Sequence, residues 1–186
     1  MTAEDLLTRL VAALNAANIP YMLTGSYASS LHSIPRATRD IDIIIFPNRD
    51  QLTAFVQSLP SSSYHTDLED AIDSLQRRSQ FNVIDYATGW KVDFIIPPFE
   101  DFNLEEFERR QLIEVGDLHL SVVSPEDIVI AKLRWAKTGQ SERQIEDAAS
   151  VVRVQGENLN LSYIEKWVRR LGLDDEWVSV CARAAG

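Results

Sequence analysis

The stretch Arg39-Asp40-Ile41-Asp42-Ile43-Ile44-Ile45-Phe46 places two aspartates at the start of a run that is otherwise apolar up to Pro47. Such a run is typical of a strand covered on both faces, and hence of a central strand in a mixed sheet. Because successive side chains of a strand alternate between its faces, Asp40 and Asp42 point the same way, roughly 7 Å apart. The stretch therefore predicts two carboxylates on one face of a central strand.

A glycine–serine pair, Gly25-Ser26, lies upstream of this strand and directly follows the apolar residues 21–24. We expect a short strand, a turn and then a helix from about Ser26 to Leu31. A glycine in such a turn lets backbone N–H groups approach phosphate oxygens, and the start of the helix adds a positive dipole end. The serine hydroxyl can donate a further hydrogen bond. Gly25 and Ser26 are therefore candidate phosphate-binding residues.

A third aspartate, Asp93, interrupts the apolar segment 90–96, which together with residues 81–86 predicts a β-hairpin. An unpaired carboxylate midway along a buried strand is costly. Placed beside Asp40 and Asp42, it would complete a three-carboxylate site. Hard divalent cations such as Mg²⁺ or Mn²⁺ prefer carboxylate, water and phosphate oxygens. We expect the three aspartates to hold a metal ion that arrives with a triphosphate.

The remaining elements follow from periodicity and capping signals. Helices are predicted at residues 6–14, 49–59 and 68–75, and a second hairpin at residues 112–115 and 118–123. Ser124 and Pro125 then start a helix, and everything beyond them is predicted to be helical. Ser141 with Gln144 resembles a second capping box. The sequence thus predicts a core at residues 1–123 and a C-terminal helical region at 124–186.

Gly25, Ser26, Asp40, Asp42 and Asp93 together resemble the pattern of the nucleotidyltransferase superfamily, whose fold is that of DNA polymerase beta and of antibiotic nucleotidyltransferases. The family pattern is Gly-Ser, a spacer, Asp-x-Asp and a third Asp. The resemblance implies an α+β nucleotidyltransferase fold, with a mixed β-sheet flanked by helices and a C-terminal helical part. It also implies an enzyme that moves an NMP from an NTP to an acceptor, with the three aspartates as catalytic metal ligands. In such a mechanism one metal ion activates the attacking hydroxyl and the other stabilises the leaving pyrophosphate.

Lys132 lies in the middle of the most apolar face of its predicted helix, near Ile128 and Trp135. One expectation is a structural role, in which Lys132 pairs with a core acid or extends past the edge of the helix into solvent. The other expectation is that it contacts a nucleotide phosphate. Here the chain resembles the AbiEii-like nucleotidyltransferases of bacterial toxin–antitoxin and abortive-infection systems, which carry a lysine and then an aspartate after the Asp-x-Asp block. Lys132 matches the lysine and Asp147 the aspartate, which makes both nucleotide-binding candidates. Asp147 lies nearly opposite the apolar stripe of its own helix, so a solvated position or an i,i+4 pair with Arg143 is the competing expectation.

Arg36 and Arg39 flank the expected site, and the guanidinium fork suits phosphate oxygens. Arg39 is therefore a further nucleotide-binding candidate, although it faces away from Asp40 in an ideal strand, where a surface salt bridge is the alternative. A turn role is expected for Asp85, and structural or surface roles for His32, His65 and His119. Core or interface positions are expected for the four tryptophans, one of which could stack on a base: Trp90, Trp135, Trp167 and Trp177.

The formal net charge is −10 and there is a single cysteine, Cys181, among the 186 residues. The acidity disfavours general nucleic-acid binding, whereas bound metal ions would compensate for the charge of an NTP locally. The sequence shows neither a signal-peptide pattern nor an apolar run of about 20 residues, so we expect a cytoplasmic protein without a membrane partner. The expected partners are an NTP, an acceptor that is a tRNA, a protein or a small molecule, and, if the chain is the toxin of a toxin–antitoxin pair, an antitoxin.

Two other functions remain open on the sequence. The chain could be a catalytically inactive nucleotide-binding or partner-binding module of the same fold, although all three carboxylates are present. It could also be a glycosyltransferase that uses Asp-x-Asp to bind a sugar nucleotide, although the upstream Gly-Ser pair and the short chain disfavour this function.

Overall fold

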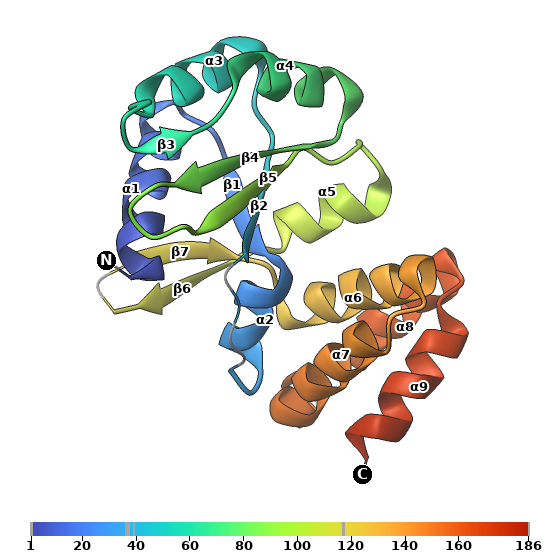
Figure 1. Ribbon diagram of the computed structural model, residues 1–186. Coiled ribbons are helices and arrows are strands. Elements are labelled where there is room, and N and C mark those ends of the chain that lie inside the picture. The colour runs from blue at the N-terminus through green and yellow to red at the C-terminus, as the bar shows by residue number, and fades with distance from the viewer. Residues whose placement is uncertain (1, 36–37, 39, 117, 186) are drawn as a thin grey trace. The chain divides into compact units, whose positions relative to one another are not determined.

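The computed structural model describes residues 2–35, 38, 40–116 and 118–185. The chain divides into two compact units, one made of Met1–Ser26 with Thr38–Val122 and the other of Tyr27–Ala37 with Val123–Gly186. The first unit contains a mixed sheet with its helices, and the second is helical (Figure 1). Nowhere in the described residues is there a helix with both the length and the apolar character needed to cross a bilayer.

Seven strands form one sheet in the described part of the chain. They are β1 (Tyr21–Thr24), β2 (Asp40–Ile45), β3 (Tyr64–His65), β4 (Gln80–Asp85), β5 (Lys91–Ile95), β6 (Gln111–Val115) and β7 (Leu118–Val122). Their order across the sheet is β3-β4-β5-β2-β1-β7-β6. β2 is central, antiparallel to β1 and parallel to β5, which confirms the prediction from its apolar run.

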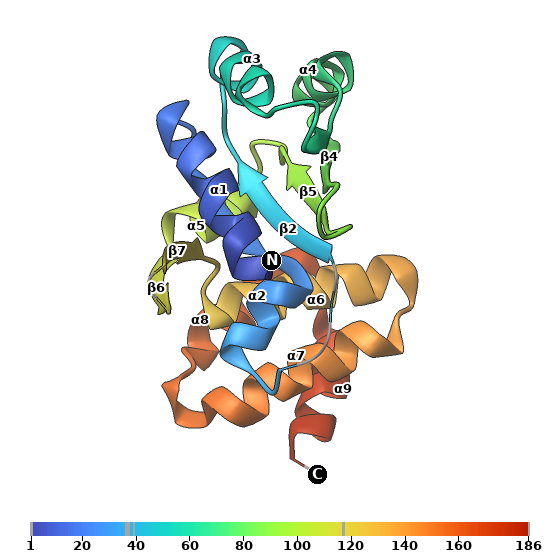
Figure 2. The same cartoon turned by 60° about the vertical axis from the view of Figure 1, so that its left-hand side comes forward.

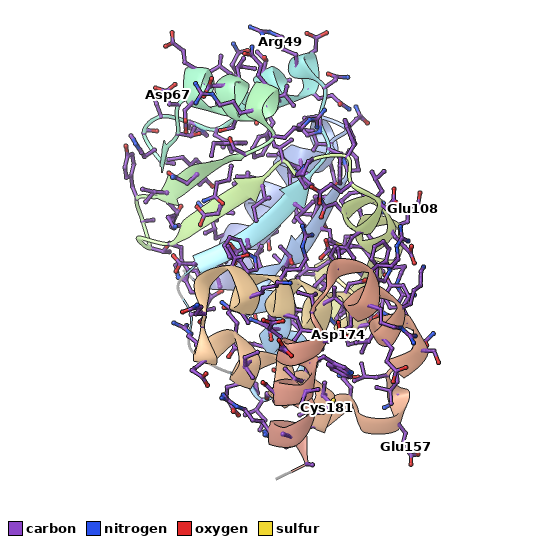
Figure 3. All side chains as sticks on the ribbon, turned by 90° about the vertical axis from the view of Figure 1, so that its right-hand side faces the viewer. Arg49, Asp67, Glu108, Glu157, Asp174 and Cys181 are labelled. Atoms are coloured by element: carbon purple, nitrogen blue, oxygen red, sulfur yellow. The ribbon has the colours of Figure 1, made fainter. Side chains whose placement is uncertain are left out.

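One face of the sheet is covered by helices that the sequence predicts, namely α1 (Ala3–Ala16), α3 (Arg49–Ser58) and α4 (Leu68–Arg77). Side-chain caps start all three helices, and Figure 3 labels Arg49 and Asp67 where α3 and α4 begin. α3 and α4 lie side by side (Figure 2). Phe55 of α3 packs edge-on against Phe94 of β5, which in turn stacks on Phe81 of β4. These aromatic contacts belong to the hydrophobic core between the sheet and these helices.

The opposite face of β2 carries a helix that the sequence analysis missed, α5 (Asp101–Glu108). Phe107 of α5 packs edge-on against Phe46, with ring centroids 4.6 Å apart, and Phe99 stacks on the same ring. By strand alternation Phe46 lies on the same face as Asp42. α5 therefore covers this face near the carboxyl end of β2, whereas the two aspartates lie near its amino end.

The second unit is built from helices that follow β7. They are α6 (Pro125–Gly139), α7 (Glu142–Gln155), the 3₁₀ turn η1 (Gly156–Asn158), α8 (Leu161–Leu171) and α9 (Asp174–Ala184), in addition to most of α2 (Gly25–His32). Figure 3 labels Asp174 and Cys181 on α9. Ser124 caps α6 as predicted, by accepting from the Asp127 amide. Asp127 is fully buried and accepts from the Tyr163 hydroxyl at 2.6 Å, which ties α6 to α8.

The predicted capping box of this unit was wrong. Ser141 precedes α7 but makes no side-chain capping bond. The Gln144 amide donates instead to the backbone oxygen of Ser141, and the Gln144 Oε1 accepts from Lys132. Of the tryptophans expected in the core or at an interface, Trp167 is buried and Trp135 is 65% exposed.

His32 has the structural role that the sequence predicts. Its Nε2 lies 2.7 Å from the backbone oxygen of Val123, and both residues belong to the second unit. Burial lowers the pKa of His32 below the usual value, so the ring is held in its neutral form. His119 lies on the surface next to Glu114.

Asp85 holds the turn between β4 and β5, as predicted, and also anchors α1. It is 1% exposed, accepts from the Thr88 amide and hydroxyl, and pairs with Arg9 at 3.1 Å. We predict that Asp85→Ala lowers the free energy of unfolding by about 3 kcal/mol, because it leaves buried donors without an acceptor. Asp73→Ala removes an exposed carboxylate from the i,i+4 pair with Arg77 and should cost less than about 0.5 kcal/mol. Urea unfolding followed by tryptophan fluorescence measures both, and equal losses would contradict the assigned role.

Candidate functional site

A row of polar side chains crosses four neighbouring strands of the sheet at the position of Asp42. Asp42 is paired in register with Asp93 of the parallel strand β5 and with Thr24 of the antiparallel strand β1. Asp93 is in turn paired with Asn82 of β4. Residues directly opposite each other on neighbouring strands face the same side of the sheet. The row Thr24–Asp42–Asp93–Asn82, hereafter the polar row, thus brings two of the three predicted carboxylates side by side.

Gly25 brings the backbone of the following turn against this row. Its φ is +67°, and a Cβ built on it would lie 1.9 Å from Oδ2 of Asp42. The reason is local, since Thr24 is the strand partner of Asp42 and the chain turns immediately after it. Only glycine combines this backbone conformation with this approach. Gly25 and Ser26 therefore start helix α2 beside the Asp42 carboxylate, as the Gly-Ser pattern predicts.

The third predicted aspartate, Asp40, lies on the same face two residues before Asp42 and is paired in register with Lys91. Its side chain is 63% exposed, whereas that of Asp93 is 10% exposed. Oδ1 of Asp93 is buried and has no hydrogen-bond partner in the described part of the chain. The three carboxylates thus run from the solvent-exposed Asp40 to the buried Asp93.

Lys91 is a residue of this site that the sequence analysis missed. Its ammonium donates to Oδ2 of Asp93 at 2.8 Å and lies 4.0 Å from Oδ1 of Asp40. The hydrogen bond to Asp93 raises the pKa of Lys91, so the side chain remains charged. The signal was available, because Lys91 and Asp93 are two residues apart on a strand and must share a face.

The donor set suits a divalent cation that brings ligands of its own. Among the described residues no group of three or more acidic, histidine or cysteine side chains is placed to hold a metal ion. The site instead offers the adjacent carboxylates of Asp42 and Asp93, one of which has a buried oxygen without a partner. Mg²⁺ is usually bound through one or two carboxylates, with water and phosphate oxygens as the other ligands. The residues present therefore fit a metal ion that is bound together with a phosphate compound.

Lys132 and Asp147 belong to the second unit, where they form a buried ion pair with each other. Nζ of Lys132 lies 3.0 Å from Oδ2 of Asp147, and the two side chains are 4% and 13% exposed. The expectation that Asp147 lies on a solvated face was wrong. Helix α7 contacts both α6 and α9, so more than its apolar stripe is covered. The nucleotide-binding roles of both residues remain predictions.

Arg39, the other nucleotide-binding candidate, lies outside the described residues, and so does Arg36.

The fold was compared with those of known proteins. No protein-family model and no curated protein sequence matches the chain. The solution structure of the antibiotic-resistance factor ANT(2'')-Ia matches with a TM-score of 0.56 at 18% identity, over 95% of this chain and 93% of its own. A nucleotidyltransferase-like antigenic protein from Paracoccidioides brasiliensis matches with a TM-score of 0.55 at 18% identity, over 98% and 94%. The lincomycin-bound lincosamide adenylyltransferase LnuA matches with a TM-score of 0.53 at 15% identity, over 81% and 96%.

These similarities establish the fold. The chain has the α+β nucleotidyltransferase fold, with a mixed sheet and flanking helices, as the sequence pattern predicts.

The approach of Gly25 to Asp42 can be tested by substitution with alanine. Gly25→Ala should lower the free energy of unfolding by at least about 2 kcal/mol more than Gly89→Ala, because both impose a positive-φ penalty of about 1–2 kcal/mol but only the first clashes with a side chain. Gly89 has a φ of +70° and open space around its Cβ position, which makes it a matched control within the same unit. Chemical denaturation of the two variants measures the difference. Similar losses would show that Asp42 does not lie against this turn.

The buried pair in the second unit predicts a non-additive result. Lys132→Met should cost about 2–3 kcal/mol of unfolding free energy, because it leaves the Asp147 carboxylate buried without this partner. The double variant Lys132→Met with Asp147→Leu should recover most of that loss. A double-mutant cycle by urea denaturation measures the coupling, and additive losses would exclude a strong pair.

Proposed function

We propose that this protein is a metal-dependent nucleotidyltransferase, which transfers an NMP from an NTP to an acceptor hydroxyl. The observation that carries the proposal is the register of β2 and β5, which sets Asp42 beside Asp93 next to the Gly25 turn. The fold, shared with nucleotidyltransferases of known structure, supports the same conclusion.

Asp42 and Asp93 are the proposed principal metal ligands, with Asp40 completing the set from the same face of β2. Two adjacent carboxylates repel each other, and a divalent cation removes that cost while preferring their oxygens. When bound, Mg²⁺ or Mn²⁺ would lower the pKa of the attacking hydroxyl and offset the charge of the leaving pyrophosphate.

Gly25 and Ser26 are the proposed phosphate-binding residues. They stand at the start of α2, where backbone N–H groups have no helical acceptor and the helix dipole is positive. Because Gly25 lies against Asp42, phosphates held at this turn would be next to the carboxylates that hold the metal. Arg39 is proposed as a further phosphate donor on the basis of its position in the sequence.

Asp93 is the proposed proton acceptor. Its Oδ2 is hydrogen-bonded to Lys91, whereas its Oδ1 has no partner among the described residues. Oδ1 would accept the proton of the acceptor hydroxyl as the oxygen forms a bond to the α-phosphorus. The bond from that phosphorus to the bridging oxygen then breaks, and pyrophosphate leaves with the electron pair.

A small hydroxylated molecule is the acceptor that we favour. ANT(2'')-Ia has been solved with adenylyl-2''-tobramycin, and LnuA with lincomycin, and this chain matches more than nine-tenths of the length of both. The net charge of −10 works against a polyanionic tRNA acceptor. A tRNA or protein acceptor, a role as a toxin with an antitoxin partner, and nucleotide contacts by Lys132 and Asp147 rest on the AbiEii-like resemblance alone.

The proposed chemistry predicts that Asp42→Asn abolishes transfer without unfolding the protein. Loss of one carboxylate from the metal site should reduce Mg²⁺-dependent pyrophosphate release by at least about a hundredfold. Asp73→Asn, on the exposed face of α4, should retain wild-type turnover. The assay combines each labelled NTP with Mg²⁺ and a panel of aminoglycosides, lincosamides, tRNA and protein acceptors. Wild-type turnover in Asp42→Asn would refute the mechanism.

An inactive nucleotide-binding module is the alternative within the same fold. It predicts tight NTP binding in isothermal titration with EDTA present and no label on any acceptor. The presence of Asp40, Asp42 and Asp93 on one face argues against it, because a module that binds without metal gains nothing from a cluster of carboxylates near a phosphate.

A further inference from the structure

The candidate site gathers three acidic side chains on one face of the sheet. Asp40, Asp42 and Asp93 share one face of two neighbouring strands, and the Asp93 side chain is only 10% exposed. Carboxylates this close repel each other, and a neighbouring positive charge relieves the repulsion when no metal is bound.

Lys91 supplies this charge from within the sheet. Its ammonium makes a 2.8 Å hydrogen bond to Asp93 and lies 4.0 Å from Asp40, so it joins the most buried carboxylate to the most exposed one. Strand register fixes this position, because Lys91 pairs with Asp40 while Asp93 pairs with Asp42. The lysine and the three carboxylates thus form a single electrostatic unit with a formal charge of −2.

We propose that Lys91 is a positioning residue that acts as the counter-ion of the metal-free site and is displaced when a divalent cation binds. Its ammonium keeps the Asp40, Asp42 and Asp93 carboxylates in place and competes with the metal for them. The inference rests on the proposed function, since it takes these aspartates to be metal ligands. Its consequence is that the site binds a metal ion weakly until a nucleotide brings further ligands.

The side chain of Lys91 is suited to displacement. It is 41% exposed, so its ammonium can return to water at little cost in solvation. A lysine is a single point charge on a flexible stem, whereas an arginine would hold a carboxylate through two parallel hydrogen bonds. With the ammonium in place the three carboxylates carry a formal charge of −2, and with a divalent cation in its place they carry −1. The gain in charge compensation is small, so the cation needs the further oxygen ligands of a phosphate compound to bind well.

A purely structural surface ion pair is the competing interpretation. Removal of such a pair would lower stability slightly without changing the affinity for metal. The counter-ion role instead predicts opposite effects on the stability of the metal-free protein and on its affinity for metal. Loss of the ammonium should destabilise the metal-free protein and strengthen metal binding.

The experiment measures Mn²⁺ binding without nucleotide, at one fixed pH, from the electron paramagnetic resonance signal of unbound Mn²⁺. Lys91→Met should bind Mn²⁺ about tenfold more tightly than the wild type, the effect expected from one partly solvated charge. Arg77→Met is the matched control, because it removes the same charge from an exposed pair on α4 and should leave the affinity unchanged. Lys91→Arg should bind no more tightly than the wild type. Thermal unfolding in EDTA should show a lower melting temperature for Lys91→Met, which added Mn²⁺ restores.

The outcomes separate this inference from the proposed function. If the wild type binds Mn²⁺ and Asp93→Asn does not, the metal site stands, and an unchanged affinity in Lys91→Met then overturns the counter-ion role alone. If neither the wild type nor Lys91→Met binds Mn²⁺, even with an NTP present, the proposed function fails and the inference fails with it. Tighter binding in both Lys91→Met and Arg77→Met would assign the effect to overall charge and would likewise overturn the role of Lys91.

Discussion

The parallel pairing of β2 with β5 forces the carboxylates of Asp42 and Asp93 to lie side by side, although like charges in a partly buried place repel each other. The sheet can impose this arrangement because its other face is a core in which Phe55, Phe81 and Phe94 pack closely. Apolar burial on that face fixes the register, since a slip of one residue would turn Phe94 out of the core. The position of the two charges is thus set by packing on the side of the sheet away from them.

This division between the two faces explains which parts of the site could be predicted from the sequence. Strand alternation alone puts Asp40 and Asp42 on one face, and an acid in an apolar strand marks Asp93 as unusual. The residue pattern alone could not place Asp93 beside Asp42, because their pairing depends on which strand lies next to β2 and in which direction; only the family resemblance implied that the aspartates share one site. The same alternation places Lys91 on the face of Asp93, but a lysine at the start of a strand is ordinarily solvent-exposed, so this signal was passed over.

Outside the sheet, the predictions failed where one helix has several neighbours. A helical wheel identifies the largest apolar stripe, and for α7 Ile145, Ala148 and Ala149 of that stripe are buried. It does not show that a polar face is also covered, which is how Asp147 comes to lie against Lys132.

The short elements were missed for a different reason. β3, an edge strand of the sheet, has two residues and α5 has eight, so neither is long enough for periodicity to distinguish it from a loop. The long amphipathic helices α1, α3 and α8 were predicted because each shows its apolar face over several turns.

The carboxylates and the Gly25 turn lie next to each other, so the ligands that they would bind affect each other. Asp42 touches the turn at which phosphates would be held, so a cation at the carboxylates and a phosphate at the turn are near neighbours. The cation relieves the repulsion among the aspartates and attracts the phosphate, and the phosphate supplies the ligands that the aspartates lack. Each ligand therefore binds better when the other is present, which is positive coupling between two adjacent sites. Lys91 would strengthen this coupling. A cation alone must compete with the Lys91 ammonium for the carboxylates. A cation with a triphosphate brings further ligands, and the phosphate also offers the displaced lysine an acceptor. In the proposed function, a site arranged in this way would bind the two components of an NTP–metal complex together and would discriminate against either one alone.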